Sequence, residues 1–188
     1  MEQREPAILS SYSATELPSF ETCFSGKHAC CFTGHRPAGL PDARSSGLVL
    51  LRKHLMETLC AAADYGVTEF LAGGARGFDT IAADAVLYLR DVMGYPIALK
   101  LLLPSPRQTE RWPAEDRDRY ETILDLADDK AFLSDTNDAA AMHKRDRALV
   151  DNADCCICYL QKMKGGTLYT VNYAMECGIS VYNLALLV

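Results

Sequence analysis

Short apolar runs and longer stretches of helical periodicity alternate along the chain. A short continuous apolar run bounded by turn residues is typical of a buried parallel strand. We expect such strands at residues 29–32, 69–72, 97–103, 130–133, 155–160 and 180–184. The third run is apolar apart from Lys100, so this strand is expected to be buried on both faces.

The stretches between these runs repeat apolar residues every three or four positions, as amphipathic helices do. The first such helix begins near Ser46, and Gly66 stands where a C-terminal cap belongs. Further helices are expected from Phe78 to near Gly94 and over residues 112–127, 138–150 and 167–177. Alternating strands and helices are joined by right-handed crossovers. We therefore predict a Rossmann-like α/β fold, a three-layer sandwich with a mostly parallel central sheet and helices on both faces.

The chain has 188 residues, which suits one domain whose core needs no disulfide for stability. Residues 1–27 mix serine, threonine, glutamate and proline with scattered apolar residues, so we expect a loosely ordered N-terminal tail. Residues 20–24 are the part of this tail that could instead dock on the domain. A single Rossmann-like domain is expected over residues 28–188.

Charge and cysteine content limit the classes of function. A net charge of -6 and a pI near 5.2 disfavour binding to extended nucleic acid, which needs clustered lysine and arginine. The cysteines at Cys30, Cys31, Cys155, Cys156 and Cys158 lie in apolar runs and are expected to be buried hydrophobes in a reducing cytosol. They lack a second well-spaced pair, so no metal site is expected. The chain has neither a signal-like start nor a membrane-length apolar run, so we expect a soluble cytoplasmic protein with no membrane contact. No cofactor is expected.

Three glycine-bearing turns follow predicted strands. Glycine lets a ligand approach the backbone, and a helix N-terminus is partially positive, so such turns suit phosphate. The carboxyl ends of parallel strands meet at one edge of the sheet, so we expect the turns to converge on one nucleotide-like ligand. Each turn alone is weak evidence, because a Gly-Gly after a strand is more often a tight turn than a phosphate site. Neither a dinucleotide fingerprint nor a Walker lysine motif is present. The turns are Thr33-Gly-His-Arg-Pro37, Leu71-Ala-Gly-Gly-Ala-Arg-Gly-Phe-Asp79 and Gly165-Gly-Thr167.

Several motifs stand in a fixed order along the chain. They are Phe32-Thr-Gly-His-Arg-Pro37, Gly73-Gly-Ala-Arg-Gly-Phe-Asp79 with Ala82-Ala83, Trp112, Met142-x-x-Arg145, Asp151 and Gly165-Gly-Thr167. Together they resemble the YpsA-like branch of the SLOG superfamily, over roughly residues 29–184. SLOG domains are named for the DNA-processing protein DprA and the phosphoribohydrolase Lonely Guy. The resemblance implies a Rossmann-like nucleotide-binding fold and leaves the reaction open.

The resemblance implies that Thr33, Gly34, His35 and Arg36 form a first binding loop. Arg36 would hold a phosphate through a bidentate charge-assisted pair, worth about 1.5–3 kcal/mol per hydrogen bond. The alternative is a surface arginine that fixes its own loop. His35 suits acid–base work through its near-neutral pKa, but a histidine that orients the loop is the commoner case.

The second turn is expected to supply Gly73, Gly74, Ala75 and Gly77 as a further cradle. Asp79 follows this turn. It either caps the next helix through the N–H groups of the first turn or hydrogen-bonds a ribose hydroxyl.

Two further ligand contacts are implied outside the glycine turns. Arg145 lies in the basic run His143-Lys-Arg-Asp-Arg147, which could equally be a solvated helix face. The resemblance implies that Arg145 contacts the ligand. The family pattern has Arg-Asn at this point and this chain has Arg145-Asp146, so an amide contact is missing. Trp112 either stacks on a base or covers the start of its helix.

The third turn distinguishes an enzyme from a binding protein. Gly165, Gly166 and Thr167 form the expected anion cradle. Lonely Guy proteins carry the motif P-G-G-x-G-T-x-x-E, in which the glutamate lies near the scissile N-glycosidic bond. In this chain Thr170 occupies the glutamate position. Glu176 stands almost two helical turns further on and does not obviously replace it.

The expected function is therefore binding of a nucleotide or nucleotide-derived signal at the carboxyl edge of the sheet, by a sensor or sequestering protein. One alternative is a nucleotide-cleaving enzyme with Asp79 or His35 as acid or base. The other is a DprA-like single-stranded DNA binder, which the acidic composition disfavours. The resemblance also implies a homo-oligomer.

Overall fold

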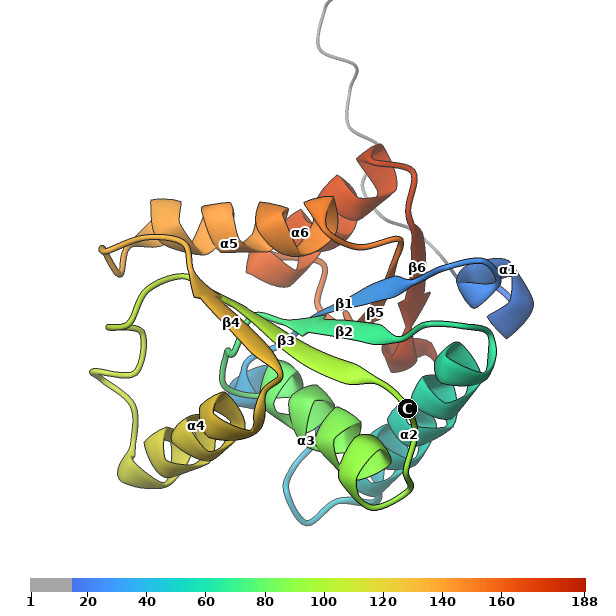
Figure 1. The fold of residues 1–188 in the computed structure, drawn as a ribbon, viewed down its shortest axis with the longest axis horizontal. Coiled ribbons are helices and arrows are strands. Elements are labelled where there is room, and N and C mark those ends of the chain that lie inside the picture. Colours follow the sequence, from blue (N-terminus) through green and yellow to red (C-terminus); the bar gives the residue numbers. More distant parts are fainter. Residues whose placement is uncertain (1–14) are drawn as a thin grey trace, which may run out of the picture.

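The short apolar segments form one parallel sheet in the computed structural model, which describes residues 15–188 (Figure 1). Their order across the sheet is β4-β3-β2-β1-β5-β6, and every neighbouring pair is parallel. The predicted parallel sheet is confirmed. Its strands are β1 Ala29–Gly34, β2 Glu69–Ala72, β3 Ala98–Leu103, β4 Asp129–Phe132, β5 Cys155–Tyr159 and β6 Ser180–Asn183.

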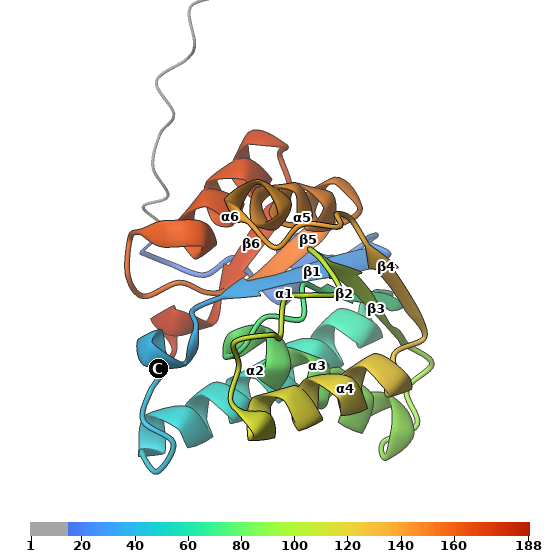
Figure 2. The same cartoon turned by 90° about the vertical axis from the view of Figure 1, so that its left-hand side faces the viewer.

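Helices cover both faces of the sheet (Figures 1 and 2). One face carries α2 Ser46–Asp64, α3 Phe78–Asp91 and α4 Ala114–Leu126, and the other carries α5 Ala139–Asp151 and α6 Gly165–Glu176. The chain adds β2, β3 and β4 on one side of β1 and then returns through α5 to place β5 on the other side. The strand order therefore reverses between β1 and β5, which is where open α/β sheets bind ligands.

Two apolar layers hold the helices against the sheet. Between the sheet and α2 to α4, the rings of Phe32 and Phe70 stack with centroids 5.8 Å apart. Between the sheet and α5 and α6, Cys156 and Cys158 belong to a second buried cluster. All the cysteines are free thiols, and those within strands are fully buried, as predicted. Burial raises the pKa of the Cys30 and Cys158 thiols, which keeps them protonated and unreactive.

Part of the segment expected as a loose tail packs on the domain. It forms the short helix α1 Phe20–Phe24, in which Cys23 and Phe24 are fully buried. The ring of Phe20 lies 5.2 Å from that of Tyr182 in β6, measured between centroids. Docking of residues 20–24 was the alternative to a loose tail and is confirmed, because their aromatic side chains gain from removal from water. Residues 1–14, the earlier part of the expected tail, lie outside the described residues.

The third strand differs from the prediction of burial on both faces, and the fourth is exposed. Leu99, Leu101 and Leu103 of β3 are buried, whereas Lys100 between them is half-buried and pairs with Glu69 at 2.7 Å. All residues of β4 are exposed. The reason is position, because β4 is the edge strand and β3 lies beside it. Among the described residues, two helices, α5 and α6, cover the second face of the whole sheet.

Helix α4 begins two residues later than predicted. Pro113 is its N-cap, and the N–H of Trp112 instead donates to the carbonyl oxygen of Thr109 at 2.9 Å in a preceding turn. A proline disfavours helical geometry in the residue before it, so the helix starts after Pro113. Within residues 15–188, no helix combines the length and apolar character that crossing a membrane requires.

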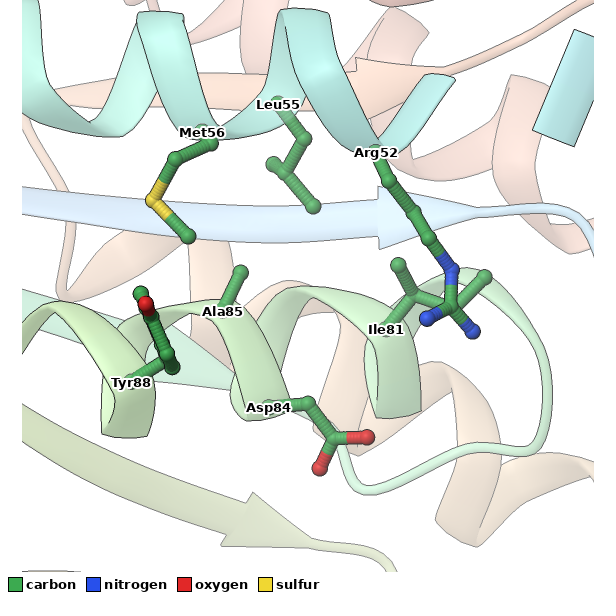
Figure 3. A pocket seen from close by; sticks show the side chains of 7 residues that line it. All are labelled: Arg52, Leu55, Met56, Ile81, Asp84, Ala85 and Tyr88. Carbon is green, nitrogen blue, oxygen red and sulfur yellow. The ribbon is translucent and has the colours of Figure 1, made fainter. Parts of the chain in front are cut away.

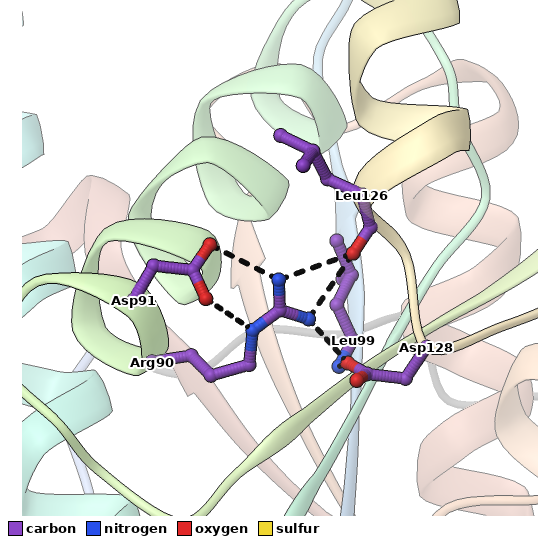
Figure 4. Close-up of polar contacts among 5 residues, drawn as sticks. All are labelled: Arg90, Asp91, Leu99, Leu126 and Asp128. Carbon is purple, nitrogen blue, oxygen red and sulfur yellow. Dashed lines mark hydrogen bonds and ion pairs between the residues drawn. The ribbon is translucent and has the colours of Figure 1, made fainter.

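An arginine cluster fixes the edge of the sheet at which the strands begin (Figure 4). Arg90, at the end of α3, donates to the carbonyl oxygen of Leu126 and contacts the carboxylates of Asp91 and Asp128 at 2.6 Å. The Asp128 carboxylate also accepts the N–H of Leu99 at 2.8 Å. These contacts join α3, α4 and β3 at the edge opposite the glycine turns.

Candidate functional site

A cavity of about 190 Å³ opens at the carboxyl edge of the sheet, between the end of β1 and the first turn of α6. We call it the inner cavity. It stands where the strand order reverses. Its lining combines predicted site residues with others from α5: Phe32, Thr33, Gly34, Arg36, Ala75, Asp79, Met142, Arg145, Asp146, Leu149, Gly166 and Thr167.

The end of β1 and the loop after it form one wall. Thr33 is buried and lines the cavity. A Cβ on Gly34 would lie 2.4 Å from the Phe78 side chain, so only glycine lets β1 approach the start of α3 this closely. Arg36 is exposed, and its guanidinium has no ion-pair partner among residues 15–188. It is therefore available to an anion in the cavity.

The first turn of α6 forms the opposite wall. Among residues 15–188, no side chain caps this helix, so its first N–H groups have no side-chain acceptor there. Gly166 and the buried Thr167 line the cavity, whereas Gly165 is exposed and does not. Free N–H groups at the positive end of a helix suit a bound anion.

A buried charged cluster forms a third wall. Arg145 donates from Nε to Asp146 at 2.7 Å and from Nη1 to the carbonyl oxygen of Gly73 at 2.6 Å. Nη1 also lies 3.8 Å from the Asp79 carboxylate, which accepts the N–H of Ala75 at 3.3 Å. Burial raises the pKa of Asp79, while Arg145 acts in the opposite direction. Arg145 therefore compensates two buried carboxylates as well as lining the cavity.

The second glycine turn contributes less lining than predicted. Ala75 and Asp79 line the inner cavity, and the remaining predicted residues of the turn do not: Gly73, Gly74 and Gly77. These glycines permit close packing instead. A Cβ on Gly74 would lie 2.5 Å from Leu103, and Gly77 has a φ of 96° that residues with a Cβ rarely adopt. Asp79 also differs from the expected helix cap, because its carboxylate binds the N–H of Ala75, which precedes α3.

His35 joins two loops and does not line the inner cavity. Its Nε2 accepts the backbone N–H groups of Gln161 at 3.0 Å and Lys162 at 2.9 Å. An accepting Nε2 carries no proton, so the ring is neutral with its proton on Nδ1. Burial, followed by the positive charge of Lys162, lowers the pKa of His35. Of the two predicted roles, these hydrogen bonds support the one that orients the loops.

Acid is expected to weaken this connection. The pKa of His35 is lower in the folded protein than its unfolded value of about 6.5. The unfolded protein therefore binds the proton first, so the free energy of unfolding falls as pH falls below about 6.5 and is unaffected by His35 above it. Urea denaturation at several pH values below about 6.5 would measure how the free energy of unfolding changes with pH. His35→Gln should lose the part of this pH dependence that His35 contributes.

His143→Gln is the matched control, because His143 is exposed on α5 and packs edge-on against Tyr169. This variant should keep the pH dependence of the wild type. An unchanged slope in His35→Gln would contradict the structural role of His35.

A second cavity of about 390 Å³ adjoins the first and shares Arg36 and Met142 with it. We call it the adjoining cavity. Trp112 lines it and packs edge-on against Tyr120, with ring centroids 5.6 Å apart. Trp112 thus covers the start of α4, beside the inner cavity rather than in it, and stacking on a base stays a prediction. The rest of the lining is Arg107, Gln108, Glu110, Arg111 and Asn137.

A further hollow of about 230 Å³ lies between α2 and α3 (Figure 3). Figure 3 shows Leu55, Met56, Ile81 and Ala85 between the helices, with Arg52 towards one end. Two packed helices alone supply this largely apolar lining, and none of the glycine turns reaches it. We therefore do not assign the site to it.

Residues 30–187 match the YpsA family model, described as the YspA SLOG family. The chain belongs to the YpsA SLOG family. Among similar relatives, a UPF0398 protein of Oceanobacillus iheyensis is 24% identical over 142 residues, which cover 73% of this chain and 76% of the relative. The UPF0398 protein YpsA of Bacillus subtilis is 28% identical over 105 residues, covering 54% of this chain and 57% of the relative. The predicted YpsA-like branch is confirmed.

Two solved structures share the fold of this YpsA SLOG domain. DNA processing protein A from Helicobacter pylori superposes with a TM-score of 0.56 at 16% identity, over 82% of this chain and 63% of that chain. DprA from Streptococcus pneumoniae gives 0.55 at 15% identity, over 86% and 50%. The YpsA SLOG domain thus spans less than two thirds of either protein. At such identity the likeness shows the Rossmann-like fold alone.

The inner cavity of the YpsA SLOG domain brings together much of the predicted site. From the predicted set it gathers Thr33, Gly34, Arg36, Ala75, Asp79, Arg145, Gly166 and Thr167. Sequence reasoning missed Phe32, Met142, Asp146 and Leu149 as lining residues. A signal for the last three was available, because Met142, Arg145, Asp146 and Leu149 are spaced as one face of a helix.

Proposed function

We propose that this protein binds the phosphate end of a nucleotide in the inner cavity and acts as a sensor or sequestering protein. The observation that carries this proposal is the meeting of the uncapped first turn of α6, the end of β1 and the unpaired Arg36 at the strand-order reversal. Backbone N–H groups, a hydroxyl at Thr167 and a guanidinium are the donors that phosphate requires.

The remaining lining favours a nucleotide over inorganic phosphate. Asp79 and Asp146 lie beside the anion-binding wall, and carboxylates accept hydrogen bonds from ribose hydroxyls. Phe32, Met142 and Leu149 add apolar surface for a sugar or base. An inorganic anion would use none of these groups.

Binding is favoured over cleavage of an N-glycosidic bond. Thr170, at the position of the Lonely Guy glutamate, is buried, and its hydroxyl donates to the carbonyl oxygen of Gly166 at 2.9 Å. Its hydroxyl is therefore engaged within α6, and the residue offers no carboxylate. His35 is also unsuited to acid–base work, because backbone N–H groups occupy its Nε2.

Single-stranded DNA is the less favoured ligand. The Helicobacter pylori neighbour is described as binding single-stranded DNA. A backbone-tracking groove needs clustered positive charge, whereas this chain has a net charge of -6. A single nucleotide needs only the local donors of the inner cavity.

Calorimetric titration of nucleoside monophosphates, with adenosine as reference, tests the proposal. Thr167→Val removes a cavity hydroxyl at nearly constant shape and should weaken binding by about 10- to 100-fold, the value of a hydrogen bond to a charged group. Arg36→Ala should weaken it similarly. The matched control is Thr170→Val, one turn further along α6, which should bind as the wild type does.

Two results would overturn the proposal. One is adenosine binding as tightly as its monophosphate, since the cavity would then not recognise phosphate. The other is no binding of any nucleotide by folded protein. Mass spectrometry of the incubated ligand should return it intact, and release of free base would make the protein a hydrolase instead.

A further inference from the structure

The adjoining cavity lies beside the inner cavity and shares Arg36 and Met142 with it. It lies where the loops after β3 and β4 meet, and hydrogen bonds fix both loops. Gln108 donates from Nε2 to the carbonyl oxygen of Gly74 at 3.0 Å, and Asn137 donates from Nδ2 to that of Arg107 at 2.9 Å. Arg36 borders both cavities.

The adjoining cavity has an excess of positive charge in an acidic protein. Its lining includes Arg36, Arg107 and Arg111 but a single carboxylate, that of Glu110. Glu110 accepts from Nε of Arg107 at 2.6 Å. Neither Arg36 nor Arg111 forms an ion pair within residues 15–188, so both guanidinium groups border the cavity without a salt-bridge partner. Carboxylates lie nearby, because Asp79 and Asp146 interact electrostatically with Arg36, and Glu110 with Arg111. Such a pair of guanidinium groups attracts an anion.

The volumes of the two cavities limit the size of ligand that each can hold. Small-molecule sites usually have volumes of about 300–1,000 Å³. The volume of the inner cavity, about 190 Å³, is below this range. The adjoining cavity, about 390 Å³, brings the combined volume of the two into the range. A ligand larger than the inner cavity would extend into the adjoining cavity.

We infer that the ligand carries a second phosphoryl group, which Arg36 and Arg111 bind in the adjoining cavity while the first occupies the inner cavity. This inference rests on the proposed nucleotide binding. It assigns the ligand to nucleotides with at least two phosphoryl groups, either consecutive or on different parts of the molecule.

Titration of matched ligands separates these arrangements. AMP is the reference, ADP carries consecutive phosphoryl groups, and adenosine 3′,5′-bisphosphate carries separate ones. At least one of the two should bind about tenfold or more tightly than AMP. Arg111→Ala should abolish this advantage and leave AMP binding unchanged, because Arg111 is exposed and borders only the adjoining cavity.

Two controls sharpen the experiment. Glu110→Gln removes the opposing carboxylate and should strengthen binding of the ligand with two phosphoryl groups. Arg117→Ala removes an arginine of α4 outside both cavities and should change nothing.

The possible failures are distinguishable. If AMP binds as tightly as both other ligands and Arg111→Ala has no effect, the inference is overturned and the proposed function stands. If none of the three ligands binds, both are overturned.

Discussion

Arg145→Ala is expected to destabilise the protein by about 3–5 kcal/mol, the cost of removing one partner of a buried ion pair. Arg145 is 6% exposed and hydrogen-bonds Asp146 and the carbonyl oxygen of Gly73. Its removal would leave the carboxylates of Asp79 and Asp146 buried without their cation. Urea denaturation at neutral pH would measure the change in free energy of unfolding.

Acid should partly rescue this variant. Burial already raises the pKa of Asp79, and Arg145 opposes that rise. Without Arg145 the folded protein would bind a proton at Asp79 more readily than the unfolded protein. The free energy of unfolding should therefore increase as pH falls from the raised folded pKa of Asp79 to its unfolded value of about 3.9. The matched control is Arg147→Ala, because Arg147 is exposed on the same helix and contacts Tyr169 and Tyr173. A loss no larger than that of the control would contradict the role of Arg145.

Gly34→Ala is expected to destabilise the protein by about 1–3 kcal/mol, as overpacking of a filled core does. The added Cβ would lie 2.4 Å from both Cβ and Cγ of Phe78, which is fully buried as the first residue of α3. A Cβ moves only with its backbone, so the strand end and the helix start must separate. Thermal or urea unfolding would measure the loss, and nucleotide binding should fall with it because this wall of the inner cavity would move.

Gly166→Ala provides the contrasting substitution. A Cβ on Gly166 would meet its nearest side-chain atom, of Asp146, at 3.8 Å, an ordinary contact, and the residue lies in the first turn of α6. Its stability should therefore equal or exceed that of the wild type. If Gly34→Ala were as stable as Gly166→Ala, the close approach of β1 to α3 would not constrain the sequence.

The fold was largely predictable because hydrophobic periodicity records which side of each element faces the core. It identified the alternation of strands and helices, and with it the edge at which the three turns converge. It did not show that β4 stands exposed at the edge, although Asp129 and Lys130 make half of this strand charged. Position within a sheet depends on the crossovers, and local pattern does not record it.

The roles of single site residues were less predictable. Glycine at Gly34, Gly73 and Gly74 looks alike in the sequence. Only the structure shows that Gly34 accommodates Phe78 and also lines the inner cavity, while the other two accommodate Arg145 and Leu103. The absence of a Cβ leaves room for a ligand or for a neighbouring side chain. Which of them occupies that room depends on what the fold places opposite the glycine.

By itself the sequence determined the fold class, the order of elements, the family and the placing of the glycine turns at one edge, because each follows from local pattern and motif order. The tertiary structure decided that Arg145 compensates Asp79, that His35 binds the loop at Gln161, and that two cavities join at Arg36. These contacts link positions far apart in the chain. Their partners are selected by crossover geometry and by the need to compensate buried charge and satisfy buried polar groups.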